Sequence, residues 1–252
     1  MGVDEALLAT AAAGGPPSLR FYTWDAAWLS LGYGQKLGSL PERCRWAGVG
    51  LVRRSTGGRA VLHGADLTYA VAAPQGLLPA GLDASYARIA AGLSRALAGL
   101  GVRVEPAPVR PAGSGSDPFD CFAEPASHEL CVAGRKLVGS AQRRAHGAVL
   151  QHGSLRLRSD PSSAARAAGV TGAAATSLLE LGCQAAPERV REALADGLAA
   201  ALGAELQLGV LSRSELAAAR HRGTSSPGVP HLGTPGDSSR GLPIGRYIPT
   251  SG

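Results

Sequence analysis

Apolar side chains recur every three or four positions over residues 83–100, the most regular helical pattern in the chain. This spacing gathers them on one face, so the segment is predicted to form an amphipathic helix. A second helix is predicted over residues 187–202, with Pro187 in the first turn, where proline is tolerated. Three shorter helices are predicted, over residues 4–13, 162–168 and 212–220.

Short apolar segments bounded by turn-forming residues predict strands between these helices. They cover residues 19–24, 27–31, 48–53, 59–63, 66–72, 102–105, 129–133, 136–142, 148–157 and 206–211. The first two strands are expected to be joined by a short turn, and a hairpin is expected to turn at Gly134-Arg135. Many short strands with few helices indicate an α+β fold with mostly antiparallel or mixed sheets flanked by helices.

The pattern of apolar residues also suggests where the domain ends. Residues 1–222 are predicted to form a single catalytic domain, which is long enough for one sizeable core. From residue 223 to 252 Gly, Pro and Ser dominate and the apolar periodicity stops. This tail is therefore predicted to be disordered.

Composition narrows the classes of function. The chain has a net charge of +6 and a pI near 9.5, which favours an acidic partner. Nucleic acid is a poor candidate, because aromatic residues make up 4% of the chain and no basic run of about five to eight residues occurs. No stretch of about 18 apolar residues predicts a membrane span, and no signal peptide is visible. The protein is therefore expected to be cytoplasmic.

The four cysteines do not suggest a metal site. They form no C-x-x-C pair and their spacing matches no zinc site. In a reducing compartment they are expected to be free thiols rather than disulfides. Cys131 and Cys183 lie in apolar segments and are interpreted as structural.

Cys121 and Lys136 are the candidate catalytic pair. A lone cysteine is more often a small buried residue than a nucleophile. However, the chain has 23 Arg and only two Lys, Lys36 and Lys136. A sequence that uses Arg for nearly every cation is expected to keep Lys where a compact, movable ammonium is needed. With the small residues around Lys136, a thiol and an ammonium suggest acyl transfer.

Two motifs resemble the biotin/lipoate protein ligase superfamily. One is Arg53-Arg-Ser-Thr-Gly-Gly-Arg-Ala-Val-Leu-His63, and the other is Gly134-Arg-Lys-Leu-Val-Gly-Ser-Ala-Gln142, followed by Leu150-Gln-His-Gly-Ser154. The resemblance extends from residue 3 to about residue 220. It implies the α+β fold of that superfamily. The chain has a Cys-Phe pair that begins fifteen residues before Lys136, and in this it is most similar to the octanoyltransferases of Gram-positive bacteria.

The resemblance implies an octanoyl-[acyl carrier protein]:protein N-octanoyltransferase that needs no cofactor. In that group the cysteine matching Cys121 forms a thioester and the lysine matching Lys136 supports it. The implied partners are octanoyl-acyl carrier protein and an acceptor, either a lipoyl domain of a 2-oxoacid dehydrogenase or glycine-cleavage H protein. Neither nucleic acid nor a membrane is an expected partner.

Three alternatives stay open. An ATP-dependent lipoate or octanoate ligase would use ATP and Mg, and Lys136 would contact an acyl-adenylate. A lipoyl-domain amidotransferase would move the acyl group between domains. A relative without turnover would only bind the acyl group, although the intact pair of Cys121 and Lys136 argues against this.

Further residues are expected to contact substrate because of their place in the two motifs. Gly57 and Gly58 are expected to let the backbone approach the acyl chain closely. His63 either orients a neighbouring group or holds the glycine loop. The full set of expected substrate-binding residues is Arg54, Thr56, Gly57, Gly58, His63, Gly139, Ser140, Ala141, His152 and Gly153.

Overall fold

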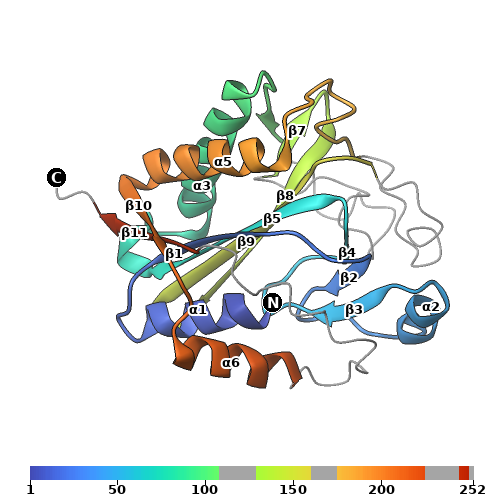
Figure 1. Ribbon diagram of the computed structural model, residues 1–252, viewed down its shortest axis with the longest axis horizontal. Coiled ribbons are helices and arrows are strands. Elements are labelled where there is room, and N and C mark those ends of the chain that lie inside the picture. The colour runs from blue at the N-terminus through green and yellow to red at the C-terminus, as the bar shows by residue number, and fades with distance from the viewer. Residues whose placement is uncertain (108–128, 160–174, 225–243, 250–252) are drawn as a thin grey trace.

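The structure is a computed structural model that describes residues 1–107, 129–159, 175–224 and 244–249. Eight strands form its main sheet, in the order β10-β11-β1-β5-β9-β8-β7-β6, and all neighbours are antiparallel (Figure 1). The strands are β1 (Ser18–Tyr22), β5 (Asp66–Pro74), β6 (Glu105–Pro106), β7 (Leu130–Val132), β8 (Arg135–Ala145), β9 (Ala148–Arg156), β10 (Ala204–Gly209) and β11 (Ile244–Pro249).

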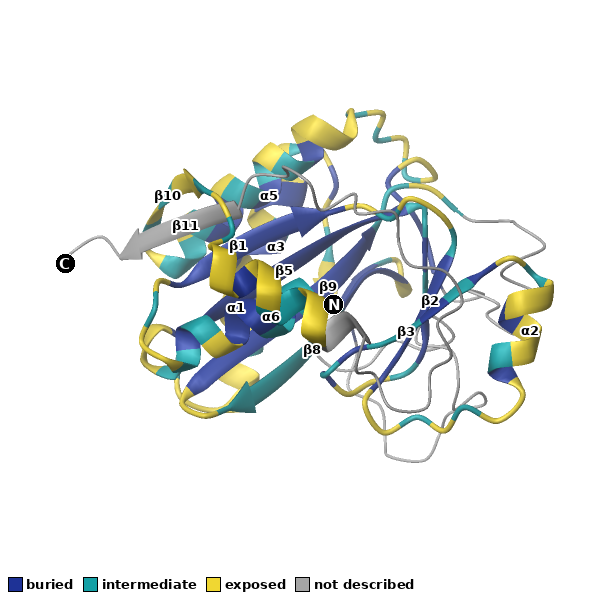
Figure 2. Cartoon of the chain, turned by 60° about the horizontal axis from the view of Figure 1, so that its bottom comes forward, coloured by how far each residue is buried: buried dark blue, intermediate teal, exposed yellow. Residues whose placement is uncertain are grey.

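Helices cover both faces of this sheet (Figures 1 and 2). On one side lie α1 (Gly2–Ala12) and α6 (Arg213–Thr224), and on the other lie α3 (Leu82–Gly99) and α5 (Pro187–Leu202). Alternate residues of β5 therefore enter different cores. Tyr69 and Val71 join the cluster under α3 and α5, whereas Ala70 and Ala72 join the cluster under α1.

A second sheet of three strands lies beside the main sheet, in the order β3-β2-β4. Its strands are β2 (Trp28–Leu31), β3 (Gly50–Arg53) and β4 (Val61–His63). β2 pairs in parallel with β3 and antiparallel with β4. The short helix α2 (Leu40–Trp46) connects β2 to β3, and its Leu40 and Cys44 complete a small apolar core with Leu29 and Leu51.

The structure confirms the α+β class and the two long helices. The last helix begins as its sequence indicates. The backbone N–H of Glu215 donates to Ser212 Oγ at 3.2 Å, and the backbone N–H of Ser212 donates to Glu215 Oε2 at 2.7 Å. These reciprocal bonds form a capping box. The short 3-10 helix η1 (Gln75–Leu77) follows β5.

Several local predictions are wrong. The strand predicted over residues 102–105 begins only at Glu105. The β7–β8 hairpin turns at Ala133-Gly134, where φ is 48° and 72°, because this tight turn requires positive φ at both central residues. The helix α2 was not predicted. The predicted helix over residues 162–168 lies outside the described residues.

The predicted disordered tail also needs correction, because residues 244–249 form β11. This strand pairs antiparallel with β1 on one side and β10 on the other. The six residues are flanked by sequence rich in Gly, Pro and Ser, so the composition of the whole tail hides the strand. Among the helices of the described chain, none is long and apolar enough to cross a membrane.

Candidate functional site

Lys136 lies at the start of β8 and is fully buried. Its ammonium donates a hydrogen bond to Glu129, which is 5% exposed. The lysine side chain runs over Gly139, where a Cβ atom would lie 2.7 Å from Lys136 Cε and 2.9 Å from Nζ. A side chain at position 139 would therefore displace the ammonium, which gives Gly139 a role in holding Lys136.

Two chain segments that the structure does not describe both end beside Lys136. The backbone N–H of Ala107 donates to the carbonyl of Glu129 at 2.7 Å, so residues 108–128 leave and return at neighbouring points. After the second segment, the backbone N–H of Thr176 donates to the carbonyl of Lys136 at 2.9 Å. Cys121 falls within residues 108–128 and so lies outside the described residues. The described chain resumes after this segment at Glu129, the residue that pairs with Lys136.

Two other thiols are buried in the fold. Cys131 lies opposite Lys136 in the β7–β8 ladder and is 0% exposed. Burial raises the pKa of Cys131, and the negative charge of Glu129 raises it further. Burial likewise raises the pKa of Cys44, under α2. Both groups therefore stay protonated thiols, which fits a structural role.

The glycine loop, residues 54–60, connects β3 to β4 and is held by Arg54. Arg54 is 4% exposed. Its guanidinium donates to the carbonyls of Ser30 (2.9 Å), Gly57 (2.9 Å) and Arg59 (2.6 Å). These bonds clamp the loop onto β2. Gly58 has φ of 89°, and a Cβ there would lie 2.9 Å from Arg54 Nη2, whereas a Cβ at Gly57 would meet nothing within 4 Å. Gly57 therefore faces open space.

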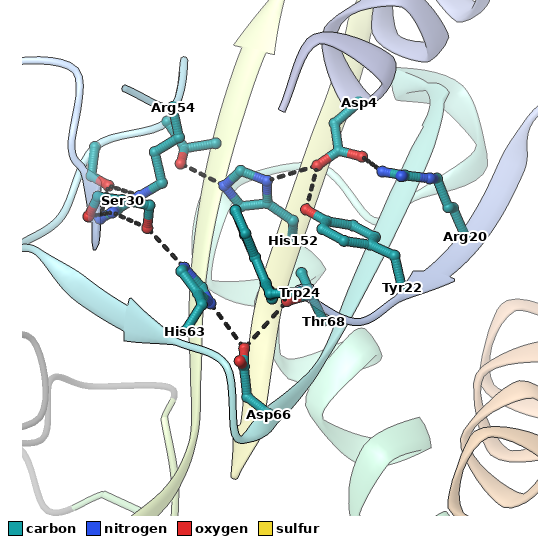
Figure 3. Close-up of polar contacts among 12 residues, drawn as sticks. Asp4, Arg20, Tyr22, Trp24, Ser30, Arg54, His63, Asp66, Thr68 and His152 are labelled. Carbon is teal, nitrogen blue, oxygen red and sulfur yellow. Dashed lines mark hydrogen bonds and ion pairs between the residues drawn. The ribbon is translucent and has the colours of Figure 1, made fainter. Parts of the chain in front are cut away.

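His63 anchors the same loop through a chain of buried hydrogen bonds (Figure 3). Its Nδ1 lies 2.8 Å from Asp66 Oδ2 and its Nε2 lies 2.8 Å from Ser30 Oγ. Ser30 Oγ also accepts a bond from Arg54 at 3.2 Å. Because a carboxylate can only accept, Nδ1 carries a proton and donates it to Asp66. The Trp24 indole stacks on the His63 ring at 4.2 Å.

His152 on β9 repeats this pattern with different partners. Its Nε2 lies 2.7 Å from Thr56 Oγ1 in the glycine loop, and its Nδ1 lies 3.3 Å from Asp4 Oδ2 on α1. Asp4 also accepts from Arg20 and from the Tyr22 hydroxyl, each at 2.8 Å. His152 thus joins a buried aspartate to the glycine loop itself, and His63 joins one to Ser30, which Arg54 also contacts (Figure 3).

Burial and hydrogen bonding set the charges in these networks. Burial lowers the pKa of His152, although its bond to Asp4 acts in the other direction, so the imidazole is neutral. Burial by itself would raise the pKa of Asp4, but the hydrogen bond to His152, the amino terminus and Arg20 together hold it well below its ordinary value. For Asp66 the opposing effect of His63 likewise outweighs burial and lowers the pKa. Both aspartates are carboxylates at neutral pH.

The predicted residues of β8 and β9 lie side by side, because Ser140 pairs with Gly153 and Ala141 pairs with His152. Ser140 Oγ bonds the Tyr69 hydroxyl at 2.7 Å. At Gly153, a Cβ atom would lie 2.6 Å from Tyr69 Cε1 and 2.8 Å from Ser140 Oγ. Gly153 thus makes room for this contact. Ala141 is half-buried and makes no polar side-chain contact by its nature.

The two parts of the site meet at β4. Val61, directly after the glycine loop, packs against Ala175. Ala175 in turn forms a bridge with Lys136. The glycine loop and Lys136 are therefore two sides of one candidate site, although Lys136 lies 78 residues after Gly58 in the chain.

The sequence reasoning missed the partners of these side chains, three acidic residues and one serine. Asp4, Asp66, Glu129 and Ser30 were not singled out, yet they hold the two histidines and Lys136. The three-residue spacing of His63 and Asp66 could have signalled that pair. The other partners come from distant positions and left no local signal. Within the described part of the chain, no group of three or more His, Cys, Asp or Glu residues is arranged to hold a metal.

An α+β domain with a buried lysine beside a clamped glycine loop defines the class of protein. The model of the lipoyl protein ligase A/B catalytic domain family matches residues 1–199, and the chain belongs to this family. Among solved structures, the fold is similar to a lipoate-protein ligase A bound with ATP, with a TM-score of 0.72 and 21% identity, covering 89% of this chain and 88% of that one. It is also similar to the lipoate protein ligase of Thermoplasma acidophilum, with a TM-score of 0.67 and 21% identity, covering 89% and 86%.

Relatives with higher identity carry a more specific name. The chain is 40% identical to Octanoyltransferase LipM of Kyrpidia tusciae, over 85% of this chain and 86% of that protein. It is 38% identical to Octanoyltransferase LipM of Symbiobacterium thermophilum, over 85% and 86%. The similarity therefore extends over most of both proteins and is not confined to the two motifs.

Proposed function

We propose that the protein is an octanoyltransferase of protein lipoylation, which moves an octanoyl group from acyl carrier protein to a lysine of a lipoyl domain or of glycine-cleavage H protein. The observation that carries this proposal is the similarity to proteins named Octanoyltransferase LipM, at 40% identity over 85% of the chain. The buried ammonium of Lys136, beside the returning end of the segment that bears Cys121, supplies the chemistry that such a transfer needs.

In the first step the Cys121 thiolate attacks the carbonyl carbon of the carrier thioester. A new C–S bond to Cys121 forms, the C–S bond to the carrier breaks, and the carrier thiolate leaves and takes up a proton. A free thiol has a pKa of about 8.5 and is only a few per cent ionised at neutral pH. A positive charge nearby raises that fraction, and Lys136 is the proposed source.

In the second step the amine of the acceptor lysine attacks the Cys121 thioester. The C–N bond forms, the C–S bond to Cys121 breaks, and the proton lost by the amine goes to the departing thiolate. The first step exchanges one thioester for another and is nearly balanced, whereas forming an amide drives completion. Lys136 also stabilises the negative oxygen that develops in both steps.

Glu129 and the glycine loop have supporting roles in this mechanism. Burying an ammonium without a partner is costly, so Glu129 supplies the compensating charge and fixes the position of Lys136. The loop side positions the acyl chain, with Gly57 and Gly58 in contact with it, and Thr56 and His63 keep the loop in place. The reaction needs neither ATP nor a metal.

Intact-mass measurement after incubation with octanoyl-acyl carrier protein tests the proposal. The wild-type mass should rise by one octanoyl group without ATP, and Cys121→Ser should abolish the increase. Cys131→Ser is the matched control, because Cys131 is buried beside the same lysine, and it should still be acylated. Transfer that requires ATP and survives in Cys121→Ser would establish the ligase alternative instead.

A further inference from the structure

Positive charge is concentrated in one part of the chain. Between Trp28 and His63 there are six basic residues and one acidic residue, Glu42, which gives this segment a net charge of +5 out of the +6 of the whole chain. The basic residues are Lys36, Arg43, Arg45, Arg53, Arg54 and Arg59. The segment comprises the three-stranded sheet, α2 and the connections between them, and five of its six basic residues lie in α2 or in the connections.

Some of these charges serve the fold. Arg54 is buried and clamps the glycine loop. Arg53 donates to three carbonyls, those of Gly32 (2.8 Å), Tyr33 (3.1 Å) and Gln35 (2.8 Å). By contrast, Lys36, Arg43 and Arg45 are exposed. They are therefore the most exposed positive charges of this segment, since Arg53 and Arg59 are half-buried.

Two aromatic side chains accompany these exposed cations. Trp46, the last residue of α2, is 90% exposed, and Tyr33 is 70% exposed. We call the exposed charged and aromatic side chains of α2 and of the segment that leads into it the α2 surface; it has a net charge of +2 and consists of Tyr33, Lys36, Glu42, Arg43, Arg45 and Trp46. Leaving an indole in water gives up the free energy of burying it, so its exposure on a charged helix needs an explanation. Trp, Tyr and Arg are also the residues that most often dominate the energy of protein interfaces.

We propose that the α2 surface is the docking site for the acidic carrier protein that delivers the acyl group. This rests on the proposed function, since it names where the donor of that reaction binds. Charge complementarity with an acidic protein accelerates encounter and makes it dependent on salt, and Trp46 provides the apolar anchor. A nucleic-acid partner is less suited, because the exposed cations are few and form no continuous run.

The position of α2 favours the donor over the acceptor. The helix packs on the small sheet, and it lies at the edge of the molecule, apart from β8 (Figures 1 and 2). An acceptor presents its amine at the end of a lysine side chain, so its surface must come close to the reacting atoms. A carrier protein holds the acyl group on a long prosthetic arm, which can span the distance from a docking surface set back from the site.

Charge reversal tests the docking site. Arg43→Glu with Arg45→Glu should raise the KM for octanoyl-acyl carrier protein by tenfold or more and weaken its dependence on salt. The octanoyl thioester of a small thiol, N-acetylcysteamine, has no carrier protein to dock, so its rate of Cys121 acylation should be unchanged. Arg95→Glu with Arg103→Glu makes the same change of charge on exposed residues of the α3 region and should leave both rates unaltered.

Trp46→Ala and Lys36→Glu provide independent tests, since both side chains are exposed and their loss does not open the core. Each should raise the same KM, and thermal melting checks the fold. A KM equal to that of the Arg95/Arg103 control would overturn the docking site. The docking site would also be overturned if these variants affected only the acceptor step, if they lost a homodimer seen for the wild type on size-exclusion chromatography, or if they lost binding to nucleic acid. If the wild type accepts neither thioester, the proposed function itself fails.

Discussion

Lys136 and the glycine loop form two sides of the candidate site, and they are held in different ways. Lys136 lies on a central-sheet strand whose backbone is fixed by β7, β9 and the bridge to Ala175. The glycine loop has no such ladder. Two backbone hydrogen bonds, from Arg54 N–H to the Leu31 carbonyl and from Tyr33 N–H to the Thr56 carbonyl, tie it to the end of β2 at 2.9 Å each, and its other bonds come from the Arg54 guanidinium and the two histidine networks.

This difference predicts how each side responds to mutation. On the sheet side, many backbone hydrogen bonds fix the position of Lys136. Changing its ammonium is therefore expected to reduce activity without unfolding the domain, whereas removing a strand is expected to reduce stability. On the loop side, a few backbone bonds are supplemented by single hydrogen bonds from side chains, and these set much of the geometry. Removing one of them should impair positioning of the acyl chain before it unfolds the domain.

The largest effect is expected at Lys136. Lys136→Arg keeps the charge but spreads it over a planar group that does not match the space over Gly139. Loss of a positioned charge of this kind reduces the rate by about 10²–10³. The rate of Cys121 acylation measures it, with circular dichroism to confirm that the fold is intact.

Lys36→Arg is the matched control, since it makes the same change at the other lysine of the chain, which is exposed. The control should keep its rate of acylation. A Lys136→Arg enzyme with near-normal turnover would remove Lys136 from the mechanism.

Removing β11 should cost stability. Truncation after residue 224 deletes the strand that pairs with both β1 and β10, and β10 then loses its place in the sheet. We expect a loss of a few kcal/mol, seen as a fall in Tm of more than about 5 °C. A truncation that removes only residues 250–252 leaves the strand in place and should melt like the wild type. Equal melting of the two truncations would mean that β11 does not contribute to the sheet.

Thr56→Val removes the hydroxyl that bonds His152 while keeping the shape of the side chain. The buried Nε2 of His152 then has no such donor, at a cost of about 1–3 kcal/mol, and we expect acylation to slow by about tenfold. Thr56→Ser restores the hydroxyl and should recover both the stability and the rate of acylation. Urea denaturation measures the stability, and the rate of Cys121 acylation is measured separately. If Thr56→Val loses stability but keeps full activity, the bond does not position the loop for catalysis.

The smallest predicted effect concerns pH. The folded pKa of His152 is lowered, chiefly by burial, so below about pH 6.5 the unfolded chain binds a proton that the folded chain resists. Stability should therefore fall as the pH drops from about 7.5 to 5.5, with a slope from this group of at most about 1.4 kcal/mol per pH unit. Asp4, whose pKa is also lowered, contributes only at more acidic pH, as it nears its ordinary value of 3.8.

The difference between wild type and His152→Gln isolates this contribution, because the variant lacks the titrating group. Its stability should change less over the same range of pH, as measured by urea denaturation in a series of buffers. Exposed His146, in the β8–β9 turn, supplies the control His146→Asn, which should keep the wild-type slope. A slope unchanged in His152→Gln would show that His152 is not the group that responds.

The sequence was most informative where a residue is unusual or a pattern is long. Lys136 was singled out because lysine is rare in this chain, and the structure places it fully buried beside an acidic partner. The helices α3 and α5 were predicted because each is long, 18 and 16 residues, so that the helical pattern continues over several turns. Such signals are local, so they can be read without knowing the fold.

The missed features depend on contacts between distant residues. Asp4 meets His152 across 148 positions of sequence, and no spacing rule connects an N-terminal helix with a central strand. The strand β11 was missed because its neighbours in the sheet, and not its composition, make it a strand. The helix α2 is only seven residues long, which is too short for a periodic pattern to emerge.

The hydrogen bond between Ala107 and Glu129 has a practical consequence. Because this bond holds Ala107 and Glu129 next to each other, the stretch between them can be exchanged for another without changing the distance that it has to span. A chimera could receive the corresponding stretch of another family member while the sheet stays intact. Such grafts would show whether the proposed nucleophile, Cys121, can be exchanged independently of the sheet that carries Lys136.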